Sequence, residues 1–267
     1  MWQLLKIEWL KVKNYRTFWI LAGLFVISVV GLNSIVHEFQ VAKPGTKGMD
    51  AAAAMLLGAP PFRFPDVWHT VSWLSGFMLF IPCLLIVILT TNEFNFKTHR
   101  QNVIDGLSRT EFVIAKIADV VVIALASTII VAITVLIFGF AEGNASFSFD
   151  KAEYLLYFFI QALSYGSVAL LMSVLFKRSG ITIGILFLYI SVLERLVQWL
   201  FIKTGLPDAG DFLPLRSVSN LIPFPFLKVI TSQMFKYQDT LYLLIAAFIY
   251  LALYVFVVKK RFETVDL

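Results

Sequence analysis

The chain has 267 residues, of which 59% are apolar and only 15% are Asp, Glu, Lys or Arg. Soluble domains carry about 45–50% apolar and about 25% charged residues, so this composition excludes a soluble enzyme domain, a coiled coil and a disordered chain. The formal net charge is +5, but the basic residues form no stripe interleaved with aromatic residues, which argues against nucleic-acid binding. The single cysteine, Cys83, rules out an internal disulfide and a cysteine-based zinc site.

The apolar residues form long runs. A bilayer core about 30 Å thick needs roughly 20 helical residues to cross it. A span of this length must be helical, because its backbone groups find no water in lipid. The sequence therefore predicts a single all-α membrane domain with six transmembrane helices. The six apolar stretches are 17–36, 71–91, 117–140, 153–176, 181–202 and 241–258.

Lysine and arginine mark the orientation of these helices. They are concentrated in the short pieces 1–16, 92–116, 177–180 and 259–267, and are sparser in 37–70, 141–152 and 203–240. By the positive-inside rule, both termini are predicted to be cytoplasmic.

Residues 1–16 precede the first span and have a helical pattern. Trp2, Leu5, Trp9 and Val12 recur at helical spacing on one face, with lysines roughly opposite. Tryptophans facing lipid and lysines facing headgroups are typical of a helix that lies in the membrane interface. We expect an interfacial helix here; the simpler alternative is a basic anchor that only sets orientation.

The cytoplasmic segment 92–111 carries the most specific local signals. Ser108 and Glu111 form a capping box directly before an apolar run, so the third span is expected to occupy 112–140. A preceding helix over 94–105 would end at Gly106. Its apolar side needs a partner, which is either the membrane surface or a cytoplasmic protein. The residues that fall roughly on that side are Phe96, Arg100, Val103 and Leu107.

Ionisable residues at membrane depth are costly and call for an explanation. Asp119 follows Lys116 by three residues, which favours a local ion pair near the inner membrane surface. Glu194 and Arg195 lie in the outer half of the fifth span, and adjacent helical residues point about 100° apart, so they cannot pair well within their own helix. They form either a structural polar clasp under the outer loops or a substrate-pathway or gating contact.

The two larger outer loops, 37–70 and 203–240, hold eight of the nine prolines. Proline fixes φ and stiffens the chain, so these loops are expected to be structured. Within the second loop, the apolar stretch 221–230 is too short to span the membrane. It is expected to be a re-entrant or interface-lying segment.

Catalytic motifs are missing from the sequence. It contains no phosphate-binding P-loop, no H-E-x-x-H and no G-x-S-x-G. The three histidines lie far apart in the sequence, so neither a catalytic site nor a metal site is expected.

The order of these parts resembles the type-2 ABC exporter permeases. That family has an N-terminal elbow helix, here 1–16, six spans with both ends inside, and a coupling helix in the first cytoplasmic loop, here 92–111. It also has an outer re-entrant segment between spans five and six, here 203–240. The residues that match its coupling-loop pattern are Glu93, Thr98, Arg100, Ser108, Arg109 and Glu111.

The resemblance implies a permease subunit in a bacterial cytoplasmic (inner) membrane that moves its substrate outward by alternating access. It implies no directly bound cofactor, a separate cytoplasmic ATPase subunit that carries ATP and Mg²⁺, and a second permease copy in a homodimer or heterodimer. The alternatives are a secondary transporter or channel, and a membrane-embedded enzyme or assembly factor. The residues expected to couple to the ATPase are Glu93, Phe96, Thr98, Arg100, Val103, Asp105, Arg109 and Glu111.

Overall fold

The computed structural model describes residues 2–41, 61–96, 98, 108–141, 146–226 and 238–264. Within these ranges the chain is helical and contains no β-strand. Six helices are long and apolar enough to cross a membrane, which confirms the expected fold class. They are Arg16–Glu38, Asp66–Asn95, Thr110–Ala141, Glu153–Phe176, Ser179–Lys203 and Thr240–Phe262.

Two of these spans are interrupted, the second by a short 3₁₀ helix (η1) and the fifth by a π-helical turn (η2). In chain order the elements are α1 (Trp2–Lys13), α2 (Arg16–Val41), α4 (Asp66–Gly76), η1 (Phe77–Leu79), α5 (Phe80–Asn95), α7 (Arg109–Ala141), α8 (Glu153–Phe176), α9 (Ser179–Leu188), η2 (Tyr189–Leu193), α10 (Glu194–Lys203), α11 (Pro207–Gly210), α12 (Pro214–Ser219) and α14 (Thr240–Thr264).

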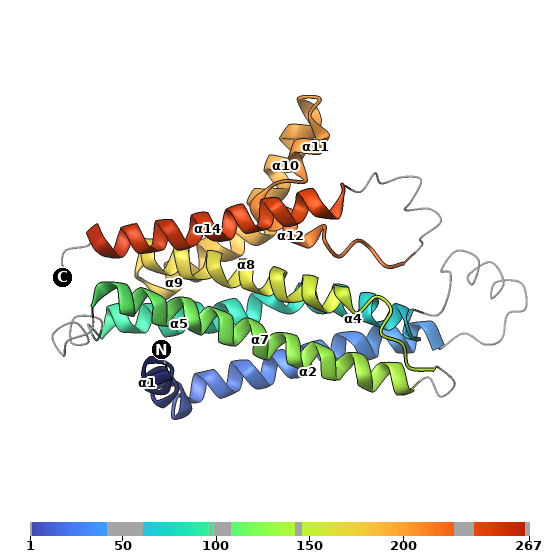
Figure 1. Ribbon diagram of the computed structural model, residues 1–267, viewed down its shortest axis with the longest axis horizontal. Coiled ribbons are helices and arrows are strands. Elements are labelled where there is room, and N and C mark those ends of the chain that lie inside the picture. The colour runs from blue at the N-terminus through green and yellow to red at the C-terminus, as the bar shows by residue number, and fades with distance from the viewer. Residues whose placement is uncertain are drawn as a thin grey trace, which may run out of the picture.

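The long helices run side by side along the bundle, and α1 lies across one end of it (Figure 1). Both termini are found at that same end. Helix α8 is central, since it packs against α4, α5, α7, α9, α12 and α14. Gly166 makes this position possible: a Cβ added to it would lie 2.9 Å from both the Ile86 and Val120 side chains. A side chain at this position would therefore push α8 away from α5 and α7.

The second span begins at Asp66, five residues before the apolar run at 71. A carboxylate in the first turn suits the positive end of the helix dipole, and Asp66 also pairs with Lys151 at 2.7 Å. Further along, η1 precedes Pro82. Proline has no N–H to donate to the carbonyl of Met78, so the helix tightens locally where this α-helical bond is missing.

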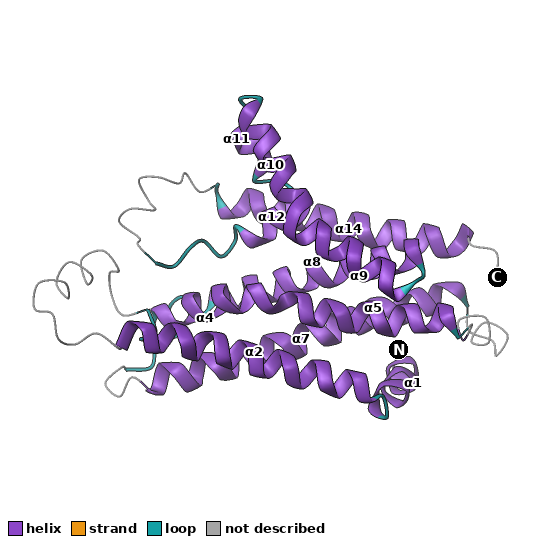
Figure 2. Ribbon diagram, turned by 180° about the vertical axis from the view of Figure 1, so that it is seen from behind, coloured by secondary structure: helices purple, strands orange, loops and turns teal. Residues whose placement is uncertain are grey.

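The fifth span is bent rather than straight. After α9, the π-helical turn η2 inserts extra backbone, and α10 then leaves the bundle together with α11 (Figures 1 and 2). The chain returns through α12, which packs on α8 and α14. The apolar run 181–202 therefore does not form a straight crossing, because this turn redirects its outer part. Of the expected re-entrant stretch 221–230, residues 227–230 lie outside the described residues.

Candidate functional site

The predicted capping box is present and starts α7. The Ser108 hydroxyl accepts the Glu111 backbone N–H at 3.2 Å, while Glu111 Oε2 accepts from the Ser108 backbone N–H at 2.9 Å and from its hydroxyl at 2.8 Å. This satisfies backbone donors that a helix start leaves without partners. The capping box thus fixes where the third span begins.

The other predicted coupling residues are only partly described. Arg100, Val103 and Asp105 lie outside the described residues, as does the side chain of Arg109. Phe96 directly follows α5 and its side chain is 74% exposed. The Thr98 hydroxyl donates to the backbone carbonyl of Glu93 at 3.5 Å.

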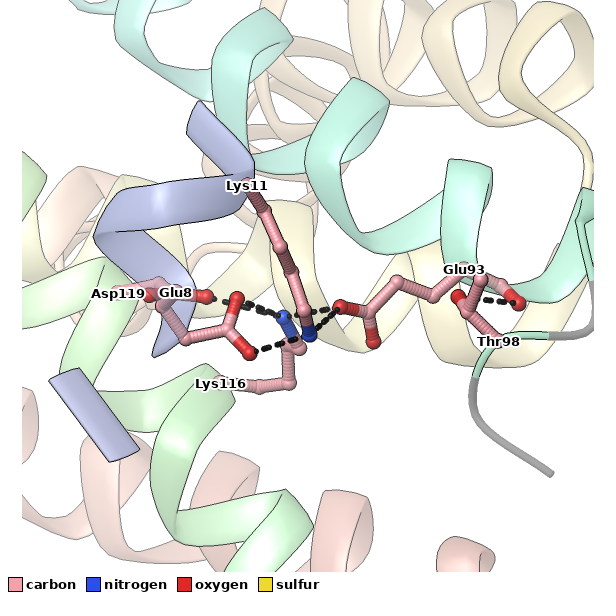
Figure 3. A network of polar contacts seen from close by, with 6 residues as sticks. All are labelled: Glu8, Lys11, Glu93, Thr98, Lys116 and Asp119. Atoms are coloured by element: carbon pink, nitrogen blue, oxygen red, sulfur yellow. Dashed lines mark hydrogen bonds and ion pairs between the residues drawn. The ribbon is translucent and has the colours of Figure 1, made fainter. Parts of the chain in front are cut away.

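Glu93 points inward, into a network of charges at the inner end of the bundle (Figure 3). At its centre is Lys116 of α7, whose side chain is 1% exposed. The Lys116 ammonium group lies 2.8 Å from Glu8 of α1, 2.9 Å from Glu93 of α5 and 3.1 Å from Asp119. The local Lys116–Asp119 pair was expected from the sequence and is confirmed, but it is one part of a larger set.

A second ammonium group completes the network. Lys11 Nζ donates to Glu8 Oε1 at 2.8 Å and to Glu93 Oε1 at 2.9 Å. Burial alone would raise the pKa of Glu8, but the attraction and hydrogen bonds of Lys116 and Lys11 outweigh it and lower that pKa below the ordinary value. Glu8 is therefore a carboxylate at neutral pH.

This network fixes the relative positions of three chain segments. Buried ion pairs add little net stability compared with apolar packing, but losing one partner leaves an uncompensated buried charge at a cost of about 3–5 kcal/mol. Moving α1, the end of α5 or the start of α7 would separate a buried ammonium group from its carboxylates. The ion pairs therefore hold these three segments in place. The network therefore constrains where the loop between α5 and α7 begins and ends.

Helix α1 turns one side toward the bundle and another side outward. Glu8 and Val12 are buried against the bundle, whereas Trp9 is 51% exposed and stands edge-on to Trp19 at 6.5 Å. Trp9 is exposed, as a lipid-facing tryptophan would be, whereas Val12 packs inward; the placement of α1 in the membrane interface stays a prediction. Glu8 and Lys11 were missed, and their partners lie 82 or 108 residues away.

Aromatic rings also attach the two ends of the loop between α5 and α7 to the last span. Phe262, near the end of α14, stacks on Phe94 at 5.8 Å and contacts Phe112 at 5.1 Å. Phe94 precedes the loop and Phe112 follows it. The Lys177 ammonium group lies 5.7 Å from the Phe94 ring, as in a cation–π contact. The two ends of the loop are thus joined to the last span as well as to α1.

Glu194 finds its partners on the outer segment. Its side chain is buried, and Oε1 accepts the Leu215 backbone N–H at 2.8 Å and the Tyr189 hydroxyl at 2.8 Å. When the Gln198 amide is oriented with its oxygen toward Arg216, that oxygen accepts hydrogen bonds from Arg216 Nε at 3.3 Å and from Nη2 at 3.1 Å. These contacts join the bent fifth span to α12 and fit a polar clasp; a gating role for Glu194 stays a prediction.

Arg195 does not share that network. Its side chain is exposed, and it makes no hydrogen bond or ion pair to any residue that the structure describes. Glu194 and Arg195 are adjacent in the sequence, but only Glu194 is buried and hydrogen-bonded. As for metals, no group of three or more His, Cys, Asp or Glu residues that could hold an ion is found among the described residues.

Comparison with known protein families identifies a match that covers most of the chain. The model of a family described as "ABC-2 family transporter protein" matches residues 4–193, which is more than half of the chain. The match includes α1, the charge network and the first five spans as far as η2. No curated protein matches the chain. With six spans, a crosswise N-terminal helix and this match, the chain belongs to the ABC-2 family of transporter membrane proteins.

Proposed function

We propose that this chain is the permease subunit of an exporter that is driven by a separate cytoplasmic ATPase. Membership of the ABC-2 family supports an ABC transporter system, and transport by such a system needs ATP hydrolysis. The sequence contains no phosphate-binding loop of its own. The proposal therefore assigns ATP and Mg²⁺ to a partner chain, and substrate passage to this chain together with a second permease copy.

The observation that carries the proposal is the double attachment of the cytoplasmic loop. Its N-terminal end is held by Glu93 and Phe94, and its C-terminal end by Phe112 and Lys116. On one side these residues join α1, and on the other side α14. A displacement of the loop by a bound protein would therefore reach the first and last helices together, as alternating access requires.

Loop residues have different tasks under this proposal. Exposed Phe96, with Arg100, Val103 and Asp105, would contact the ATPase. Buried Glu93 would instead hold the loop on the bundle. Arg109 and Glu111 belong to the start of α7, and Glu111 caps it through Ser108. Glu93 thus acts as a positioning residue rather than as part of the docking surface.

The test is replacement of residues 97–107 by a Gly/Ser linker of equal length. The full-length permease, purified from the membranes of its own cells, is expected to bring down a P-loop ATPase with measurable ATP hydrolysis. The linker variant should reach the membrane at the same level and lose that ATPase. As a matched control, residues 42–52 in the first outer loop are replaced in the same way and should change nothing. Equal recovery of the ATPase with the 97–107 linker would overturn the proposal.

A further inference from the structure

An apolar groove opens between α7, α8 and α14 on the side of the bundle. Its volume is about 580 Å³, within the range of small-molecule sites in proteins. Leu163 and Leu170 of α8 form part of its lining, with Val120 of α7 on one side and Leu251 and Val255 of α14 on the other. Ser167 also lines it, but its hydroxyl is bonded to the Leu163 carbonyl of its own helix at 2.8 Å.

One end of the groove carries a positive charge. Lys259 lines it and is exposed, and it makes no ion pair with any of the residues described. This end is the end of the bundle where both termini lie, which the charge distribution predicts to be cytoplasmic. The groove therefore has hydrocarbon along its length and a cation near the inner membrane surface.

The length of the groove corresponds to one leaflet. From Phe248 to Lys259 is 11 residues of α14, or about 16 Å at the helical rise of 1.5 Å per residue. The hydrocarbon core of a bilayer is about 30 Å thick, so this is about half of it. An acyl chain that starts at Lys259 would reach the middle of the membrane where the groove ends.

We propose that this groove holds one anionic phospholipid of the inner leaflet. The acyl chain lies along α8 between α7 and α14, and the phosphate pairs with Lys259. The lipid joins the third span to the sixth near the inner end of the bundle. The proposal does not depend on the ATPase, since it rests only on the groove and its cation.

The experiment counts lipids that stay bound to the full-length chain. The chain, with any subunits that accompany it, is reconstituted in vesicles of equal phosphatidylglycerol and phosphatidylethanolamine, extracted, stripped with detergent and weighed by native mass spectrometry. One phosphatidylglycerol per chain should remain. Lys259→Gln should lower the ratio of retained phosphatidylglycerol to phosphatidylethanolamine about fivefold, the effect of one basic residue near an anionic surface. Lys13→Gln is the control, since Lys13 is exposed at the same end but does not line the groove.

A second pair of variants tests the groove itself. Ala252 lines it, so Ala252→Trp should fill it and abolish retention of either lipid. Leu253 is 49% exposed on the same helix and does not line the groove, so Leu253→Trp should leave the lipid in place. Retention of phosphatidylglycerol by Ala252→Trp would overturn the proposal, as would an equal effect of Lys13→Gln. A loss of paired permease copies in Ala252→Trp with unchanged lipid would also overturn it and assign the groove to a second copy.

Discussion

The ammonium group of Lys116 lies 2.8 Å from the carboxylate of Glu8, although 108 positions separate the two residues (Figure 3). Both side chains are buried, so neither charge is well solvated without the other. This contact attaches the crosswise helix α1 to the first turns of the third span.

Lys116→Met should therefore destabilise the protein by about 3–5 kcal/mol, because Lys11 alone then faces three carboxylates and pairs with only two of them, Glu8 and Glu93. The measurement is thermal unfolding in detergent. Adding Glu8→Gln to Lys116→Met should recover part of the loss, since one buried charge is then removed. Purely additive losses in the double variant would show that the two residues do not act as a pair. Lys13→Met, at an exposed position, is the matched control.

Phe96→Ala should separate coupling from stability. Phe96 is 74% exposed, and surface substitutions usually change stability by no more than about 0.5 kcal/mol. We expect ATPase recovery with the permease to fall severalfold while thermal unfolding stays unchanged. Leu156 is 58% exposed in the first turn of α8, at the opposite end of the bundle, so Leu156→Ala should affect neither. Equal loss of ATPase in both variants would contradict the docking surface proposed for Phe96.

Phe262→Ala should weaken the connection between the loop and the sixth span. It removes the ring that contacts both Phe94 and Phe112, and each such aromatic contact is worth about 0.5–1.5 kcal/mol. The ATPase should still copurify, but the permease should lose stimulation of its hydrolysis by substrate. Ile249→Ala on the same helix, where the side chain is 61% exposed and does not line the groove, should keep that stimulation. Normal stimulation in Phe262→Ala would limit the proposed transmission to α1.

Removal of charge should lower stability at Glu194 but not at Arg195. Glu194→Leu deprives the Leu215 backbone N–H and the Tyr189 hydroxyl of their acceptor, and each buried donor left without one costs about 1–3 kcal/mol. Glu194→Gln keeps an acceptor oxygen and should lose less. Arg195→Leu should leave the stability of the single chain unchanged, because Arg195 contacts no described carboxylate. Chemical unfolding in detergent compares the three; a larger loss in Arg195→Leu than in Glu194→Leu would refute the clasp.

Two glycines give a matched test of helix packing. At Gly166 a Cβ would meet Ile86 and Val120 at 2.9 Å, whereas at Gly184 nothing lies within 4 Å. Gly166→Leu should lower stability by about 1–3 kcal/mol or more through overpacking of the α5–α7–α8 contact. Gly184→Leu should leave the unfolding temperature of the single chain unchanged. If Gly184→Leu instead lowers the amount of paired permease in membranes, Gly184 lies in the contact between two copies.

The sequence was sufficient for features that depend on composition or on near neighbours. Six spans follow from the apolar runs, and the start of α7 follows from Ser108 and Glu111, three residues apart. The inward turn of Glu8 and the contacts of Phe262 could not be predicted in this way. They depend on partners that are distant in the sequence.

The bend at η2 has a similar origin. The run 181–202 is apolar enough for a straight span, and no proline marks the position where it turns. The bend coincides with a long-range contact, in which the Leu215 backbone N–H of α12 donates a hydrogen bond to the Glu194 carboxylate. Local propensity alone does not include that contact.

The two attachments of the cytoplasmic loop differ in physical kind, and they should therefore respond differently to their surroundings. The link to α1 is ionic, so water or a competing charge that reaches Lys11 can weaken it. The link to α14 is made of stacked rings, which salt leaves almost unchanged. A protein that pushes on the loop from the cytoplasm and admits water on the side of α1 would release that side first.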